Sequence, residues 1–185
     1  MSLYEESQAA RSTRAGGTFY ANDLVLAREQ MRGLNEAPHV IRAEDQLWED
    51  SPHGRIKWIA HPGLSANVTD IEAYIQELSP DGRSGKHRHM AEEFVFILEG
   101  RGYSLHWDVE ALIGDDYEWR VADTPQRFEW KAGDWMYVPV NTVHQHFNSD
   151  GEEPVRFISA TSLIFKYLMW HDLEQLEAAP EWQQP

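Results

Sequence analysis

The chain of 185 residues contains no cysteine. Disulfides, thiolate metal ligands and cysteine nucleophiles are therefore excluded, and any bound metal must be held by nitrogen and oxygen atoms. Basic residues are also few, with 16 Lys and Arg against 31 Asp and Glu and a net charge of -15. Because nucleic-acid binding needs a basic surface, we expect no nucleic-acid partner.

Long apolar runs are missing as well. No run approaches the roughly 20 apolar residues that a membrane span needs. Residues 1–17 lack the basic and then apolar pattern of a secretory signal peptide. We therefore expect a cytoplasmic protein without a membrane partner, whose length suits one domain with a real core.

Short apolar runs separated by turn signals fill the middle of the chain. Many short strands of this kind predict an antiparallel sandwich or barrel. No internal repeat is visible, so one barrel unit is expected. The expected strands are residues 45–49, 55–60, 71–78, 93–98, 102–107, 128–130, 135–138, 143–147 and 155–160. The two strands that flank Gly100 read as a hairpin.

Both ends of the chain differ from this middle part. Residues 1–18 are polar and predict a flexible arm. A helix capped by Asn22 or Asp23 is expected to run up to Pro38 on the outside of the barrel, within a domain of residues 19–162. From residue 163 apolar residues recur at helical spacing, which predicts a C-terminal helix and tail over 163–185.

Histidines and a glutamate gather in the segment after the third expected strand. His87 and His89 are two residues apart, so on an extended strand both imidazoles leave the same face. Glu93 can reach the same point only if the chain turns back, and the bend is expected at residues 90–92. These side chains can therefore share one metal ion.

A second segment is expected to complete the group. His144 follows a predicted turn at residues 139–142. Asn141 in this turn tolerates a positive φ better than any residue except glycine. Three imidazoles and one carboxylate then converge, which is the donor set of a divalent metal ion.

The two segments resemble the two sequence motifs of the cupin family. The pattern HxHxxxExxxxxxG fits His87, His89, Glu93 and Gly100, and GxxxxxPxNxxHxxxN fits Gly133, Pro139, His144 and Asn148. The resemblance implies an all-β fold, the cupin double-stranded β-helix or jelly-roll barrel, with short N-terminal and C-terminal helices. It also selects Glu93 rather than Glu92 as the carboxylate ligand.

Two further histidines fall on expected strands of the barrel. His146 follows His144 by two residues and would face the same cavity, where it could orient a substrate or move a proton. Its alternative role is to hydrogen-bond a ligand, or to lie in water at the strand end. His106 would line the substrate pocket or fill the interior. The remaining histidines, His39, His53, His61 and His171, are expected in solvent.

The nature of the metal chemistry follows from the resemblance. The segments around both motifs are similar to the gentisate dioxygenase branch of cupins, although that branch does not use the position of Glu93 as a ligand. This favours Fe(II), and the donors also allow Mn(II), Ni(II), Co(II), Cu(II) or Zn(II). Four protein ligands on an octahedral ion leave two positions, enough for a small oxygen-rich or aromatic acid together with O₂.

A dioxygenase is therefore the expected enzyme. There are two alternatives to a dioxygenase. One is a redox-neutral enzyme that catalyses decarboxylation, lysis or isomerisation at the same ion, and the other is a cupin that binds a small molecule without turning it over. Insertion of the acidic segment 108–125 between the two motifs could cover the pocket mouth. The N-terminal arm and the C-terminal helix are expected to cross between the subunits of a homodimer.

Overall fold

The computed structural model describes residues 2–6, 18–65, 67–170 and 173–183, and of Tyr117 the backbone alone. The chain divides into two units, Met1–Ala37 and Pro38–Pro185. The first contains helix α2 (Phe19–Glu36), which has no buried residue. The expected arm of residues 1–18 lies mostly outside the described residues. None of the described helices has the length and apolar character required to cross a membrane.

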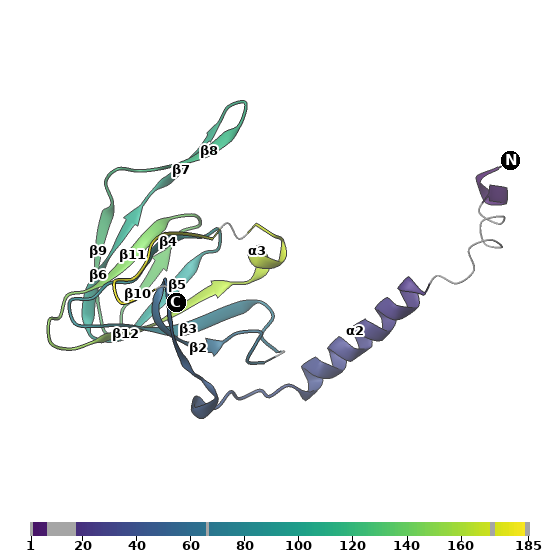
Figure 1. Ribbon diagram of the computed structural model, residues 1–185, viewed down its shortest axis with the longest axis horizontal. Helices are drawn as coiled ribbons and strands as arrows, with labels where there is room; N and C mark the ends of the chain where they lie inside the picture. The colour runs from purple at the N-terminus through teal and green to yellow at the C-terminus, as the bar shows by residue number, and fades with distance from the viewer. Residues whose placement is uncertain (1, 7–17, 66, 171–172, 184–185) are drawn as a thin grey trace. The chain divides into compact units, whose positions relative to one another are not determined.

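The second unit is built from two antiparallel sheets (Figure 1). The six-stranded sheet has the order β1-β2-β3-β12-β5-β10. Its strands are β1 (Trp48–Ser51), β2 (Gly54–Ala60), β3 (Ile71–Leu78), β5 (Glu93–Glu99), β10 (Trp135–Val138) and β12 (Val155–Ser162). The five-stranded sheet has the order β13-β4-β11-β6-β9. Its strands are β4 (Lys86–Arg88), β6 (Arg101–Trp107), β9 (Gln126–Lys131), β11 (Val143–Asn148) and β13 (Glu174–Glu177).

The strands that the sequence predicts are present, with shifted ends. The strand expected from residue 45 begins at Trp48, because Ala43–Asp45 form the 3₁₀ helix η1. The acidic segment between the motifs forms a hairpin of its own from β7 (Val109–Ile113) and β8 (Tyr117–Val121). Figure 1 shows this hairpin projecting from the two sheets.

The core lies between the two sheets. Along β5 the buried residues Glu93, Val95 and Ile97 alternate with the exposed Phe94 and Phe96. Successive side chains of a strand point to opposite faces, so this alternation places one polar and two apolar side chains in the interior. The buried apolar cluster contains Leu78, Val95, Ile97, Trp130, Val138, Val155 and Phe157.

The hairpin expected around Gly100 does not form. β5 pairs with β12 and β10, whereas β6 pairs with β11 and β9, so the two strands belong to different sheets. Gly100 has φ 86° and turns the chain from one sheet to the other. The prediction was wrong because a short glycine turn permits either connection, and long-range strand pairing decides between them.

The short C-terminal helix that the sequence predicts is present as α3 (Ile164–Tyr167), a single turn after which Met169 has a left-handed φ of 58°. The helical spacing continues in the sequence up to Leu176, but residues Glu174–Glu177 form β13, which pairs with the edge strand β4. The spacing was therefore misleading beyond α3, because pairing with an unfilled sheet edge outweighs a weak helical preference.

The core predicts a large effect at Phe157, which has no solvent exposure and lies edge-on to Trp130 at 6.3 Å between ring centroids. We expect Phe157→Ala to lower the free energy of unfolding by about 3–5 kcal/mol, because it removes packing and leaves a cavity. Denaturant unfolding measures the change. The matched control, Phe19→Ala, alters an exposed ring of helix α2. Equal losses in the two variants would contradict this position of the core.

Candidate metal centre

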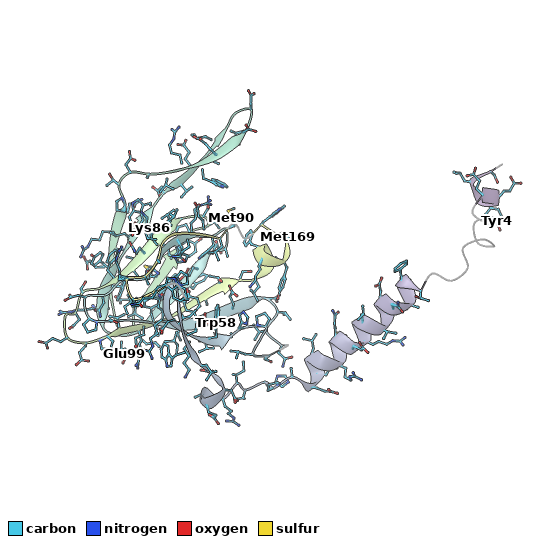
Figure 2. The ribbon with its side chains drawn as sticks, in the orientation of Figure 1. Tyr4, Trp58, Lys86, Met90, Glu99 and Met169 are labelled. Carbon is cyan, nitrogen blue, oxygen red and sulfur yellow. The ribbon has the colours of Figure 1, made fainter. Side chains whose placement is uncertain are left out.

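The two sequence motifs meet between the sheets. His87 belongs to β4, His89 directly follows it, and Glu93 begins β5 after a bend at residues 90–92 (Met90 is labelled in Figure 2). His144 on β11 lies opposite His87 in the strand register. One nitrogen or oxygen atom from each of the four side chains lies within 4.8 Å of the others. The structure therefore brings together the four residues that the sequence singles out.

Hydrogen bonds orient two of the imidazoles. His89 has Nδ1 2.8 Å from the Ala91 carbonyl and Nε2 3.0 Å from Glu93 Oε2. His144 repeats this arrangement, with Nδ1 2.9 Å from the Thr142 carbonyl and Nε2 3.2 Å from the same carboxylate oxygen. A neutral imidazole carries one N–H, so it cannot donate to both acceptors. Each ring therefore needs either a second proton or a bound cation.

The carboxylate of Glu93 is fully enclosed, with 1% exposure. Burial alone would raise the pKa of Glu93, but the bonds with His144 and His89 lower it well below the usual value. Ser159 donates a further hydrogen bond of 2.6 Å to Oε1. Burial alone would lower the pKa of His89, but the hydrogen bond between His89 and Glu93 outweighs it, so the pKa of His89 is raised. The buried carboxylate is thus stabilised by hydrogen bonds together with a nearby positive charge, either on His89 or on a bound cation.

These features fit a divalent cation. His87 Nδ1 is buried and has no hydrogen-bond partner among the described residues, and burial lowers the pKa of this imidazole well below its ordinary value. A neutral imidazole with a free electron pair is a metal donor. His87, His89, Glu93 and His144 would hold the ion through nitrogen and oxygen atoms, a set that suits first-row transition metals.

The turn before His144 is locked to the other motif. Asn141 has the left-handed φ of 61° that the sequence predicts, and its N–H donates to the His89 carbonyl at 2.9 Å. Arg88, which is almost fully buried, donates to Asn141 Oδ1 at 2.7 Å. The same guanidinium bonds Glu174 of β13 at 2.7 Å. Arg88 therefore connects the two ligand segments and the C-terminal strand.

A cavity of about 370 Å³ opens onto two of the four residues. Its lining consists of Glu49, Ser51, Pro52, His53, Ile56, Trp58, Glu72, Tyr74, His87, His89, Thr161, Leu173 and Gln175. Most of these side chains come from β1 to β3 and from the C-terminal segment. The cavity gives a small molecule access to the histidines of the first motif.

Sequence reasoning missed His53 and Tyr74 in this cavity. His53 was expected in solvent, but its ring lies edge-on to His87 at 4.4 Å between centroids and its Nε2 is 2.8 Å from the Tyr74 hydroxyl. Burial lowers the pKa of His53 to about 4 and raises that of Tyr74 well above its usual value. Alternation along β3 could have placed Tyr74 inside, whereas no local signal shows that the turn with His53 folds over the barrel.

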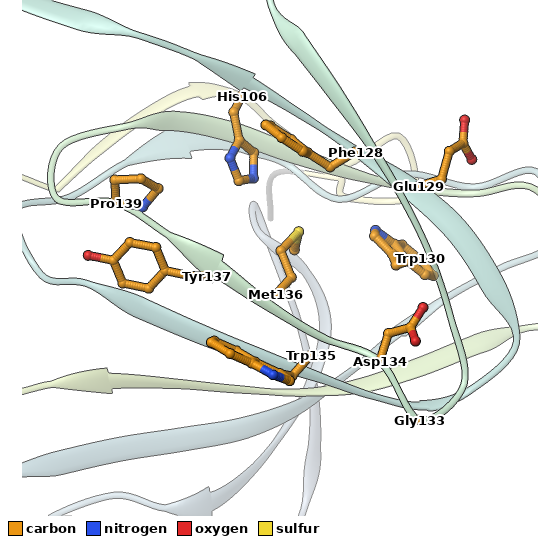
Figure 3. A pocket seen from close by; sticks show the side chains of 10 residues that line it. All are labelled: His106, Phe128, Glu129, Trp130, Gly133, Asp134, Trp135, Met136, Tyr137 and Pro139. Carbon is orange, nitrogen blue, oxygen red and sulfur yellow. The ribbon is translucent and has the colours of Figure 1, made fainter.

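His106 lines a different cavity, of about 590 Å³, between the edge strands β9 and β10. Figure 3 shows its ring directed towards Met136, with Phe128 and Tyr137 nearby. His106 lies opposite His144 in the register, with ring centroids 6.2 Å apart. Its Nε2 is buried and has no partner among the described residues, and burial lowers its pKa to about 4. A role for His106 in binding the substrate stays a prediction.

His146 is fully buried on the same strand as His144, with ring centroids 5.6 Å apart. Its Nδ1 is 2.7 Å from the Ser104 hydroxyl, which also accepts a 2.9 Å hydrogen bond from Trp130. Burial lowers the pKa of His146 well below the ordinary value. His146 lines neither of the two cavities. Its catalytic role stays a prediction. The alternative position in water at the strand end is wrong because the side chain is fully buried, and the hydrogen bond goes to Ser104.

The described side chains of the hairpin β7–β8 line neither the cavity over His87 nor the cavity beside His106. Trp119 of β8 contacts the first motif, with its ring centroid 5.6 Å from the guanidinium carbon of Arg88. Among the described residues, the insertion therefore contacts the first motif at Arg88 and contributes nothing to the walls of these two cavities.

Two facing antiparallel sheets with three histidines and a glutamate between them define a cupin. The chain belongs to the auxin binding protein family, whose pattern matches residues 50–181. It is 25% identical to auxin-binding protein T92 and 26% identical to auxin-binding protein T85, both from Nicotiana tabacum. Each of these alignments spans 145 residues, 74% of this chain and 72% of the relative.

Solved structures of oxalate decarboxylases share the fold. A formate complex of the Lactobacillus farciminis enzyme has a TM-score of 0.51 and 21% identity over 64% of this chain. The Bacillus subtilis enzyme, with Mn(II) centres, has a TM-score of 0.52 and 20% identity over 65% of this chain. The matches cover 31% and 28% of those longer chains. At this level of identity the similarity supports the fold alone.

The buried histidines predict how stability depends on pH in metal-free protein. Burial lowers the pKa of His53 and the pKa of His106 from the ordinary 6.5 to about 4 in the folded chain. Between these values the unfolded chain binds protons that the folded chain does not, so stability falls as the pH is lowered from about 6.5 to about 4. His89, whose pKa is raised, opposes this loss of stability. Denaturant unfolding at pH 7 and at pH 5 measures the net change in stability.

The variant His106→Gln keeps a polar side chain but cannot titrate, so the loss of stability between pH 7 and pH 5 should be smaller in this variant. His39→Gln changes an exposed histidine and is the matched control. Identical pH dependence in His106→Gln and the natural chain would contradict the burial of the neutral imidazole.

Proposed function

We propose that this protein is a metal-dependent cupin enzyme that binds a small aromatic or oxygen-rich acid in the cavity over His87 and His89. The observation that carries the proposal is a buried group of three histidines and one glutamate that opens onto that cavity. Buried groups of this composition are more typical of a metal site than of a structural core.

Charge supports an acid as the ligand. Three neutral imidazoles, one carboxylate and a divalent ion sum to a single positive charge, which one carboxylate of a ligand neutralises. When bound, the ion would supply a Lewis acid or a redox centre for the oxygens of the acid. The net charge of -15 on the whole chain does not oppose this, because the nearest charges dominate an enclosed site.

The wall of the cavity supports an aromatic or apolar body on that acid. The Trp58 ring lies edge-on to Tyr74 at 5.3 Å between centroids, and Ile56 and Leu173 complete the apolar part of the lining. Aromatic rings pair well with such edges and faces. These side chains would hold the ring of the ligand and keep water from the histidines.

Dioxygenation with Fe(II) is the reaction that we put first, on the resemblance of both motif segments to the gentisate dioxygenase branch. Redox-neutral decarboxylation is the other reaction that this donor set supports, and oxalate decarboxylases have the same fold. In either reaction His87 and His89 would face the acid, and Glu93 would fix the charge of the site. Proton movement by His146 belongs to this proposal.

Binding without turnover is the second candidate function. It is favoured by the match of residues 50–181 to the auxin binding protein family. The same cavity and the same four residues would then bind an aromatic acid and release it without a chemical change. Oxygen consumption and release of carbon dioxide separate the three possibilities.

The decisive experiment begins with the metal content of protein purified without added metal. About one transition-metal ion per chain is expected, followed by oxygen uptake when a hydroxylated aromatic acid is added. Carbon dioxide release without oxygen uptake would replace dioxygenation by decarboxylation. If calorimetry shows that the acid binds, neither gas is exchanged and the acid is recovered unchanged, binding without turnover is supported. A changed acid without gas exchange would instead support lysis or isomerisation. Protein that holds no metal would refute the proposal.

The variant His144→Ala removes one of the four donors, and we expect at least a hundredfold loss of metal affinity, measured by competition with a chromophoric chelator. His39→Ala alters an exposed histidine and should bind metal as the natural chain does. Circular dichroism checks that both variants remain folded. Unchanged metal affinity in His144→Ala would exclude the centre as described.

We also propose a cytoplasmic homodimer. Its support is the outer face of the six-stranded sheet, where Phe94, Phe96, Trp135 and Tyr137 are 50%, 46%, 65% and 39% exposed. Exposed apolar patches of this kind are typical of subunit contacts. Light scattering is expected to give twice the chain mass of 21.4 kDa, and Trp135→Glu to shift the mass towards the monomer. A monomeric natural chain at micromolar concentration would contradict the dimer.

A further inference from the structure

The cavity over the metal centre contains a pair of polar side chains that do not belong to the four ligand residues. His53, in the turn between β1 and β2, has its Nε2 2.8 Å from the hydroxyl of Tyr74 on β3. Both line the cavity together with His87 and His89. A molecule that reaches the two ligand histidines through this cavity therefore also meets the His53–Tyr74 pair.

The pair is held in place by three neighbouring strands. Tyr74 lies opposite Trp58 of β2 and opposite Ser159 of β12 in the register of the sheet. Ser159 in turn donates its hydroxyl to Glu93. The phenol is therefore fixed relative to the metal centre by strand pairing, and not by a mobile loop. A group positioned in this way can discriminate between ligands.

The pair has hydrogen-bonding capacity left for a ligand. A phenol hydroxyl offers one donor and two acceptor positions, and a neutral imidazole offers one donor and one acceptor. The bond between His53 and Tyr74 uses one donor and one acceptor, and the Tyr74 hydroxyl is also hydrogen-bonded to Ser159. Because Ser159 donates its own hydroxyl to Glu93, the phenol is the donor in the bond to Ser159. At least one acceptor position remains at the cavity wall, which suits the hydroxyl of a ligand.

The charges of the cavity lining disfavour a second carboxylate on the ligand. The lining contains the carboxylates Glu49 and Glu72 and no lysine or arginine. Lys166, which is not part of the lining, lies 3.9 Å from Glu72 and is half exposed. Apart from the ion, the described lining therefore has no cation to match another negative group.

We propose that the His53–Tyr74 pair is a second anchoring site of the cavity, which binds a neutral hydroxyl group on a monocarboxylic acid and excludes dicarboxylic acids. This inference rests on the proposed function, in which the carboxylate of the acid lies at the metal centre. It adds that the other polar group of the ligand is uncharged and bound by residues of β3 and the β1–β2 turn.

The test compares matched probe acids on the manganese-loaded chain by titration calorimetry. The probes are benzoate, the three isomers of hydroxybenzoate and the three isomers of benzenedicarboxylate. At least one hydroxybenzoate is expected to bind about tenfold more tightly than benzoate, the ratio that one good neutral hydrogen bond supplies. Every benzenedicarboxylate is expected to bind more weakly than that hydroxybenzoate.

The variant Tyr74→Phe keeps the ring and removes the hydroxyl, so it should reduce the tenfold ratio between the affinities for hydroxybenzoate and for benzoate to about one. Tyr103→Phe removes a hydroxyl from a ring that stacks on Phe147 outside the cavity and is the matched control. Metal content is measured for each protein, because Tyr74 lies opposite Ser159, which bonds Glu93.

The outcomes separate the two proposals. If benzoate binds and no hydroxybenzoate binds more tightly, or if Tyr74→Phe keeps the advantage, the anchoring site is refuted and the proposed function stands. If a benzenedicarboxylate binds as tightly as the best hydroxybenzoate, the exclusion of a second charge is refuted. If no acid binds the metal-loaded natural chain, the proposed function fails together with this inference.

Discussion

The carboxylate of Glu93 is the constraint around which the interior of this cupin is arranged. It lies between the sheets with 1% exposure and is hydrogen-bonded to His89, His144 and Ser159. A buried charge of this kind is tolerated only when opposite charge and hydrogen bonds surround it. Strands β5, β11 and β12 and the end of β4 must therefore come together at this point for the barrel to close around it.

The sequence was sufficient to predict the fold class and the convergence of His87, His89, Glu93 and His144. The two-residue period of a strand and the positive φ tolerated by Asn141 are local signals that could be read from single residues. The meeting of the two distant motifs is not local, and it was predicted from their resemblance to the motifs of cupins.

Other structural features that depend on long-range strand pairing could not be predicted from the sequence. The turn with His53 carries every local sign of a solvent loop, and only its packing over β3 brings the imidazole to His87. Residues 174–177 show helical spacing in the sequence, but the free edge of β4 pairs with them as β13. The segments flanking Gly100 look like a hairpin until the partners of β5 and β6 are known.

β13 connects the distant end of the chain directly to the candidate metal centre. Gln175 lies opposite His87 in the strand register, and Leu173 and Gln175 form part of the cavity wall. A proteolytic cut or an inserted fusion sequence in this short strand would open the cavity and expose the edge of β4, although the three histidines and Glu93 would remain. Protein engineers should therefore treat residues 173–177 as part of the site, and not as a dispensable tail.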